Sequence, residues 1–128
     1  MSAGTPYAAL GAAAGVRELV DTFYDQMDAD PAYAPLRAVH HPDLGAAREK
    51  LYLFLSGWLG GPNLYIERYG HPRLRARHLP FAIGSLERDQ WHACMAQALA
   101  ACGVDEALRT RLLEAFYQTA DFMRNQPG

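Results

Sequence analysis

The chain has 128 residues, half of them hydrophobic and a fifth charged, with a formal net charge of −2. A chain of this size suits one domain that buries its own core, so we expect a single domain over residues 1–128. The nearly balanced charge excludes an electrostatic surface for nucleic acid, and we expect no nucleic-acid partner.

The sequence gives no sign of a membrane segment or a secretory leader. Its most apolar stretch, residues 51–59, is much shorter than the roughly 20 residues that cross a bilayer. The first residues lack the basic segment and apolar run that are typical of a signal peptide. We therefore expect a cytoplasmic protein without a membrane partner, with flexible tails at residues 1–6 and 125–128.

The first helices follow from hydrophobic periodicity. A short turn at residues 6–10 precedes a glycine-containing stretch, residues 11–15, that we expect to be a flexible joint. From Val16 to Asp28, apolar residues recur at intervals of three and four, which predicts an amphipathic helix. Its apolar face includes Tyr24, whose hydroxyl costs about 1–3 kcal/mol if it is buried without a partner. Tyr24 therefore requires a hydrogen-bonding partner.

Two further helical segments are expected before residue 60. Asp30 and Pro31 form a typical helix start, and this short segment extends to Val39 before a sharp turn at residues 40–42. A longer helix begins near Asp43 and ends before the two glycines and the proline of residues 60–62. Its apolar face is predicted to contain Leu44, Ala47, Leu51, Phe54, Leu55 and Trp58.

Residues 60–81 interrupt the helical pattern. Prolines and glycines divide this stretch, so we expect an irregular connection with one or two helical turns around residues 73–78. Long connections in compact domains are usually functional or disordered, and the apolar content here argues against disorder. The stretch therefore directs attention to His78, which lies between Arg77 and an apolar segment.

The C-terminal part is predicted to form two helices. Ser85 is the expected cap of the first, which ends at Gly103, and the second extends from about Asp105 to Arg124. Because no segment alternates with a period of two, the predicted class is all-α. Four substantial helices and one long loop are expected to form a helical sandwich around a pocket.

The pattern of possible ligands favours a cofactor held by one side chain. The five histidines and two cysteines lack the spacing of a zinc site, and no serine or cysteine lies on the sharp turn of a hydrolase nucleophile. A haem needs one imidazole ligand, apolar walls and a few cations for its propionates. His78 is the candidate ligand, and the surrounding candidates are Lys50, Leu51, Phe54, Arg73, Arg75, Arg77, Leu79, Phe81, Ile83 and Met95. From spacing alone, a surface or capping histidine beside solvated arginines is an open alternative.

Several strings together resemble one known family. They are Trp58-Leu59-Gly60-Gly61-Pro62, Gly70-His71-Pro72-Arg73-Leu74-Arg75, Arg77-His78-Leu79-Pro80-Phe81 and Arg88-Asp89-Gln90-Trp91. The chain is similar, over most of its length, to the truncated haemoglobins of the second group. This resemblance implies a globin-like two-over-two α-helical sandwich around a haem b. It also implies that His78 is the proximal iron ligand, and that Tyr24 and Trp91 face the distal ligand.

Further positions are implied by the same resemblance. His40 matches a distal position, although the neighbouring His41 is the alternative, and Ala47 matches the position that holds a histidine in many globins. Lys50, Tyr65 and Arg77 match positions at the haem edge. One departure is Ala12, where relatives have the second glycine of a pair.

The function implied by the resemblance is binding of dioxygen and other small ligands, including nitric oxide, carbon monoxide and sulfide. The alternative is a haem redox enzyme with nitric oxide dioxygenase or peroxidase-like activity. An unidentified reductase is expected as a partner, and the protein is expected to be a monomer or a homodimer. A haem-free helical interaction module is a third possibility.

Overall fold

The computed structural model describes residues 4–127, and within this range it contains helices and no strands. In this described part, no helix combines the length and the apolar character needed to cross a membrane. One 3-10 turn, η1, covers Pro31–Tyr33. The α-helices are α1 (Pro6–Ala9), α2 (Ala12–Ala29), α3 (Ala34–Ala38), α4 (Gly45–Trp58), α5 (Leu64–Tyr69), α6 (Leu74–His78), α7 (Ser85–Ala101) and α8 (Glu106–Phe122).

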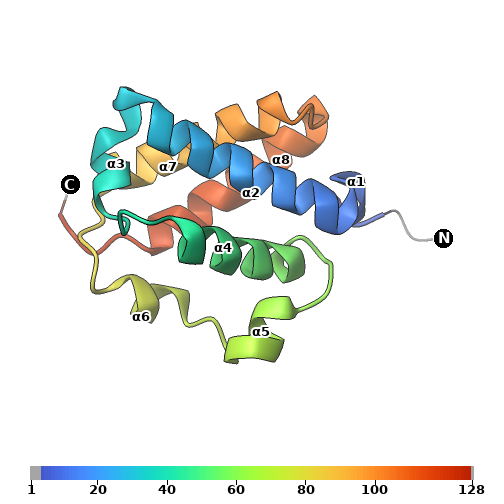
Figure 1. The fold of residues 1–128 in the computed structure, drawn as a ribbon, viewed down its shortest axis with the longest axis horizontal. Coiled ribbons are helices and arrows are strands. Elements are labelled where there is room, and N and C mark those ends of the chain that lie inside the picture. The colour runs from blue at the N-terminus through green and yellow to red at the C-terminus, as the bar shows by residue number, and fades with distance from the viewer. Residues whose placement is uncertain (1–3, 128) are drawn as a thin grey trace.

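The four long helices form two packed pairs. Helix α2 contacts both α4 and α7, and α7 contacts α8. In Figure 1, α2 and α4 lie in front of α7 and α8, while α5 and α6 lie along the edge beyond α4. Trp58 of α4 stacks on Phe116 of α8 with ring centroids 4.4 Å apart, which joins the two layers. This arrangement is the predicted helical sandwich.

The core lies between these layers. Its completely enclosed side chains come mainly from α2 and α7, and each such apolar side chain contributes about 1.5–3 kcal/mol by its burial. The largest of them are Phe23, Leu19, Met27, Leu55, Leu59, Met95 and Leu99. The periodicity of the α2 sequence thus predicts the face that is buried.

Several predicted boundaries differ from the structure. Helix α2 begins at Ala12, so the joint before it is reduced to Gly11. Ser85 is the first residue of α7 rather than its cap, and the backbone N–H of Gly84 donates to Glu87 Oε1 at 2.7 Å. The stretch expected to be irregular contains the helix α5 in addition to α6. The Glu87 side chain caps the start of α7 by bonding to Gly84, three positions before it. Ser85 is therefore not the cap, although serine is a common capping residue.

A close helix contact explains the use of glycine near the N-terminus. Thr5 Oγ1 accepts a hydrogen bond from the Ala8 N–H at 3.1 Å and caps α1. A Cβ atom added at Gly15 would lie 1.7 Å from the carbonyl oxygen of Leu10, so a larger residue there would push α1 away. Residues 1–3 of the predicted N-terminal tail lie outside the described residues, whereas residues 5–9 are ordered by this cap.

The C-terminal segment is hydrogen-bonded to the loop before α7. The backbone N–H groups of Asn125 and Gln126 both donate to the carbonyl oxygen of Ile83, at 2.8 and 3.1 Å. Their partner lies about forty positions away and leaves no local signal in the sequence. The flexibility of residues 125–128 stays a prediction. Gly128 lies outside the described residues.

Ala12→Gly is expected to stabilise the protein. Ala12 has φ +57° and follows Gly11 at φ +103°, so an alanine occupies a left-handed conformation. This conformation costs a residue with a Cβ about 1–2 kcal/mol, and glycine adopts it freely at some cost in unfolded-state entropy. We expect a net gain of about 0.5–1 kcal/mol in the free energy of unfolding. Urea unfolding with an unchanged m-value would measure this gain. A loss of stability would contradict the inference that Ala12 is strained.

Candidate functional site

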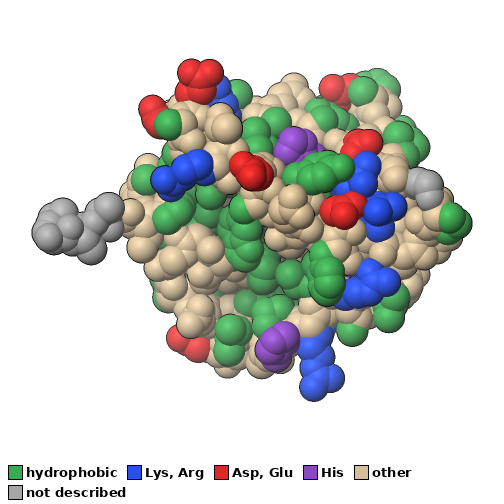
Figure 2. Space-filling model, turned by 180° about the vertical axis from the view of Figure 1, so that it is seen from behind, with side chains coloured by type: hydrophobic (Ala, Val, Ile, Leu, Met, Phe, Trp, Pro, Cys, Tyr) green, Lys and Arg blue, Asp and Glu red, His purple; other side chains and the backbone are tan. Residues whose placement is uncertain are grey.

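The candidate site lies between the helical layers and the α5–α6 edge. Figure 2 shows the face opposite to that of Figure 1, where hydrophobic side chains surround a recessed area beside a cluster of acidic and basic groups. A pocket of about 200 Å³ lies between α4, α5 and the segment that follows α5, lined by Leu53, Phe54, Gly57, Trp58, Asn63, Tyr65, Ile66 and Pro72. Two of these residues, Phe54 and Tyr65, belong to the predicted haem-contact set.

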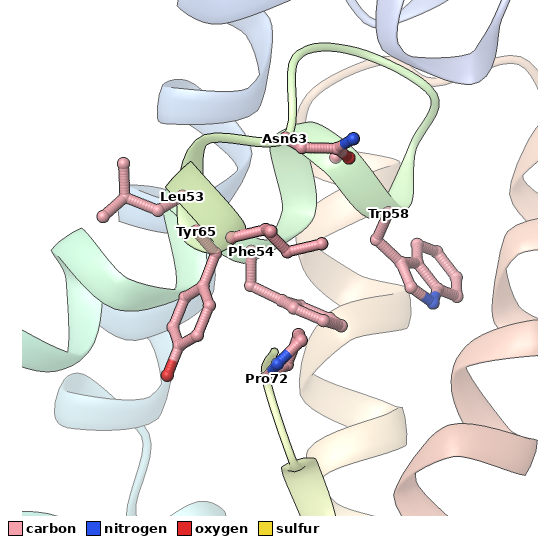
Figure 3. Close-up of a pocket in the computed structure, with 8 residues that line it drawn as sticks. Leu53, Phe54, Trp58, Asn63, Tyr65 and Pro72 are labelled. Atoms are coloured by element: carbon pink, nitrogen blue, oxygen red, sulfur yellow. The ribbon is translucent and has the colours of Figure 1, made fainter. Parts of the chain in front are cut away.

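Aromatic rings form the wall of this pocket. In Figure 3 the Phe54 ring points toward Pro72, and Tyr65 extends beside it. The rings of Phe54 and Tyr65 meet edge to face, with centroids 6.3 Å apart and an interplanar angle of 88°. Trp58 and Pro72 also line the space, although sequence reasoning assigned no wall role to either. The aromatic part of the wall is therefore apolar, as a hydrophobic ligand requires.

His78 ends the short helix α6, and its ring has a defined orientation. Its Nδ1 lies 2.6 Å from the carbonyl oxygen of Leu74, one turn earlier. Because a carbonyl oxygen only accepts hydrogen bonds, Nδ1 carries the proton in this contact and Nε2 retains its lone pair. A hydrogen bond of this kind is the usual way in which a metal-binding imidazole is oriented. His78 is thus prepared to ligate through Nε2.

Tyr24 lies on the buried face of α2 with only 5% of its surface exposed. Its ring is in edge contact with the neighbouring Phe23 at 5.0 Å. Within residues 4–127 its hydroxyl forms no hydrogen bond, and it is not completely enclosed, since the enclosed side-chain atom without a partner in this range is Gln26 Oε1. Burial raises the pKa of this hydroxyl far above its ordinary value, against an opposing attraction from Arg48. The group therefore stays a protonated donor at neutral pH.

His40 faces Tyr24, and His41 does not take this place. The rings of His40 and Tyr24 lie 5.8 Å apart in an edge contact. His40 is half-buried and its Nδ1 lies 3.0 Å from the Leu36 carbonyl oxygen, whereas His41 is exposed and accepts from the Asp43 N–H. Burial lowers the pKa of His40, against the opposing Leu36 hydrogen bond. The neutral ring therefore presents an accepting Nε2 toward the Tyr24 side.

The remaining distal candidates come from α7 and α4. Trp91 is half-buried and packs on Phe23 at 5.3 Å and on Phe116 at 5.5 Å, so Phe23 connects it to Tyr24. Ala47 and Leu51 are partly buried and pack against the same core. Met95 differs from the other predicted wall residues because it is completely enclosed, with 0% exposure. Met95 packs within the hydrophobic core, and its contact with a haem stays a prediction.

The predicted cations occupy different surroundings. Arg77 donates from Nε to the Pro72 carbonyl oxygen at 2.6 Å, and its guanidinium lies 5.7 Å from the Tyr65 ring. The exposed Lys50 ammonium lies 5.8 Å from the Tyr69 ring. These two cations and two tyrosines are the positive rim of the candidate site. Phe81, a predicted wall residue on the following loop, is 45% exposed.

Arg75 is a correction to the sequence-based assignment. As a candidate for propionate binding it should face the pocket, but its Nη1 donates to the carbonyl oxygens of Phe122 and Arg124, both at 2.8 Å. These acceptors lie at the end of α8, far away in the sequence. A guanidinium has a long reach, so an alternating run of arginines does not define which of them face a ligand.

Sequence reasoning also missed a side chain beside the distal group. Arg48 donates to Asp21 Oδ1 at 3.1 Å and to Asp25 Oδ1 at 2.7 Å, and thereby links α4 to α2. Its guanidinium lies 5.8 Å from the Tyr24 ring. The two carboxylates occupy consecutive turns of α2, and their spacing on one face is the signal that would have indicated a shared cation.

Comparison with known proteins gives one consistent result. The sequence model of the bacterial-like globin family matches residues 5–125. A group 2 truncated haemoglobin of Bacillus subtilis is 40% identical, with 98% of this chain and 92% of that protein covered. A group 2 truncated haemoglobin of Lotus japonicus is 35% identical over 63% of this chain and 49% of its own length.

Solved structures agree with this match. A cold-adapted truncated haemoglobin from Pseudoalteromonas haloplanktis has a TM-score of 0.93 at 43% identity, covering 96% of this chain and 99% of its own. A group II two-on-two haemoglobin from Agrobacterium tumefaciens has a TM-score of 0.94 at 40% identity, covering 98% of each chain. The expected two-over-two fold is therefore confirmed. The chain belongs to the bacterial-like globin family, as a truncated haemoglobin of the second group.

Proposed function

We propose that this globin holds one haem b through His78 and binds dioxygen and other small ligands on the side of Tyr24. The observations that support the proposal are the contact of His78 Nδ1 with the Leu74 carbonyl oxygen, which leaves Nε2 for a metal, and the Tyr24 hydroxyl, which forms no hydrogen bond within residues 4–127. Such a donor gains a partner when a ligand binds beside it. A bound haem supplies an iron with one coordination position open to a ligand.

The residues around His78 have complementary roles. Leu51, Phe54 and Tyr65 would offer apolar surface to a bound haem, as would Phe81, whose ring is exposed. Arg77 and Lys50 neutralise the propionates, and Tyr65 adds a hydroxyl at the same rim. A carboxylate that lies beside such an exposed cation gains modestly, because water screens the charge. Retention of the haem therefore depends mainly on His78 and the apolar walls.

The distal side is a set of polar groups around a small space. Tyr24 donates its hydroxyl hydrogen to a bound ligand, and the Trp91 indole N–H is a second donor. His40 in its neutral form accepts through Nε2, and it becomes a donor only when it is protonated. Ala47 leaves room beside them. This arrangement favours ligands that carry partial negative charge, which dioxygen acquires and carbon monoxide does not.

Absorption spectra of the purified protein reconstituted with hemin test the proposal. We expect one haem per chain, a Soret band in the ferric form, and distinct bands after reduction and after exposure to dioxygen or carbon monoxide. A chain that shows no Soret band after hemin addition would contradict the proposal and favour a haem-free module. Adding a reductant together with nitric oxide or peroxide extends the test, because sustained turnover would identify the redox enzyme.

Dioxygen release is expected to slow as the pH falls through the range below 6.5. Burial lowers the pKa of His40, so the ring gains its second proton only below the ordinary histidine value. The protonated ring can donate from Nε2 toward the Tyr24 side, and one additional hydrogen bond changes a rate by up to about tenfold. Stopped-flow dissociation between pH 5 and pH 8 measures this. His40→Phe should remove the pH dependence of dioxygen release. An unchanged pH dependence in that variant would assign the effect to another titrating group.

A further inference from the structure

The segment that follows α8 is fastened to the loop that follows His78. The Asn125 side chain lies at the centre of this contact: its Nδ2 donates to the Phe81 carbonyl oxygen at 2.7 Å and to the His78 carbonyl oxygen at 3.2 Å. Its Oδ1 accepts from the Ile83 N–H at 2.9 Å. Because the loop offers two acceptors and one donor, the amide has a single orientation that satisfies all three.

The backbone strengthens the same contact. The N–H of Asn125 donates to the Ile83 carbonyl oxygen at 2.8 Å, so these two residues exchange hydrogen bonds through backbone and side chain. On the other side of His78, Arg75 of α6 donates to the carbonyl oxygens of Phe122 and Arg124. The C-terminal segment therefore holds the chain both before and after His78.

The start of α7 is attached to the same segment. Arg88 bonds Asp121 Oδ1 at 2.8 Å, and Arg124 bonds the same oxygen at 2.7 Å. These ion pairs fix the end of α8 relative to α7, and Asn125 extends from this fixed point to the His78 loop.

Helix α6 needs such support. It has only five residues and contains no buried residue. A helix of this length is not stable by itself, because the cost of its first turn is not recovered. The orientation of the His78 ring depends on its bond to Leu74 within this helix, so anything that moves the helix or its following loop also moves the ring.

We propose that Asn125 is a positioning residue for His78, which sets the direction and the rigidity with which the imidazole meets the iron. This inference rests on the proposed haem function. The amide does not touch the cofactor and acts through the carbonyl oxygens of His78 and Phe81. The C-terminal segment thus belongs to the proximal side of the site.

The test compares three variants of the haem-loaded protein. Asn125→Ala removes the side-chain bonds to His78, Phe81 and Ile83, and Asn125→Asp keeps the acceptor for Ile83 while it places a carboxylate against two carbonyl oxygens. Gln118→Ala, at an exposed position of α8, is the matched control. Resonance Raman spectroscopy of the ferrous ligand-free form gives the iron–histidine stretching band, and transfer to excess apomyoglobin gives the rate of haem loss.

Both Asn125 variants are expected to broaden and shift the iron–histidine band and to accelerate haem loss about tenfold, the effect of one or two net hydrogen bonds. Hydrogen exchange of residues 74–83 should become faster in the same samples, whereas Gln118→Ala should match the wild type. An unchanged band with a lower Tm would show a structural role only and would overturn the inference. A wild-type chain that takes up no haem would overturn the proposed function as well, whereas unchanged bands in a haem-loaded set overturn the inference alone.

Discussion

His78→Ala is expected to yield a folded protein that loses its haem during purification. Nε2 of this ring is the single strong ligand that we assign to the iron, and its orientation is already fixed by the Leu74 carbonyl oxygen. Removing groups that merely orient a metal ligand costs about 10–100-fold in affinity, so removing the ligand itself should cost at least about 100-fold. The ratio of Soret to protein absorbance after gel filtration, together with the rate of transfer to apomyoglobin, measures the loss.

Two controls separate ligation from folding. His71→Ala removes an exposed histidine whose Nδ1 accepts from the Arg73 N–H in the same connection, and it should retain haem. Free imidazole added to His78→Ala should restore part of the binding, because it can enter the space that the side chain vacates. Unchanged haem content in His78→Ala, with helical circular dichroism preserved, would assign the iron to another residue.

The fold was largely predictable because its helices are strongly amphipathic. In α2 the apolar residues recur regularly from Val16, and the same residues are buried in the structure. The start of α2 was missed because Gly15 suggested a break, whereas it serves the close approach of α1. Helix α5 was missed because only six residues lie between the segments with glycine and proline, which is too short for periodicity to be recognised.

The candidate site was predictable only in part. Tyr24 was indicated by a hydroxyl on an apolar face, and the structure shows it buried and without a partner within residues 4–127. The partners of Arg75 and Asn125 could not be predicted, because they lie more than forty residues away and no local pattern indicates them. Met95 was predicted as a wall residue from its apolar character, and the structure encloses it in the core, so its contact with a haem stays a prediction. The type of a residue therefore predicts what its side chain can bind better than it predicts where that side chain points.

The combined variant Tyr24→Phe and Trp91→Leu is expected to keep its haem and to release dioxygen at least about a hundredfold faster. Each wild-type donor forms a charge-assisted hydrogen bond to a ligand with partial negative charge, worth about 1.5–3 kcal/mol. Since about 1.4 kcal/mol corresponds to a tenfold change, each single variant should accelerate release about tenfold to hundredfold. The carbon monoxide dissociation rate should change much less, because that ligand carries little negative charge. Stopped-flow ligand replacement measures both rates.

Tyr33→Phe is the matched control for the loss of a tyrosine hydroxyl. Tyr33 is also buried, but its hydroxyl donates to Gln97 Oε1 at 2.7 Å and is therefore not available to a ligand. Its removal should lower stability by about 1 kcal/mol and leave dioxygen release unchanged. The two single variants complete a double-mutant cycle, in which a non-additive product would show that both groups bond the same ligand. An unchanged dioxygen rate in the combined variant would contradict the distal assignment, because this variant lacks both proposed donors and still contains His78.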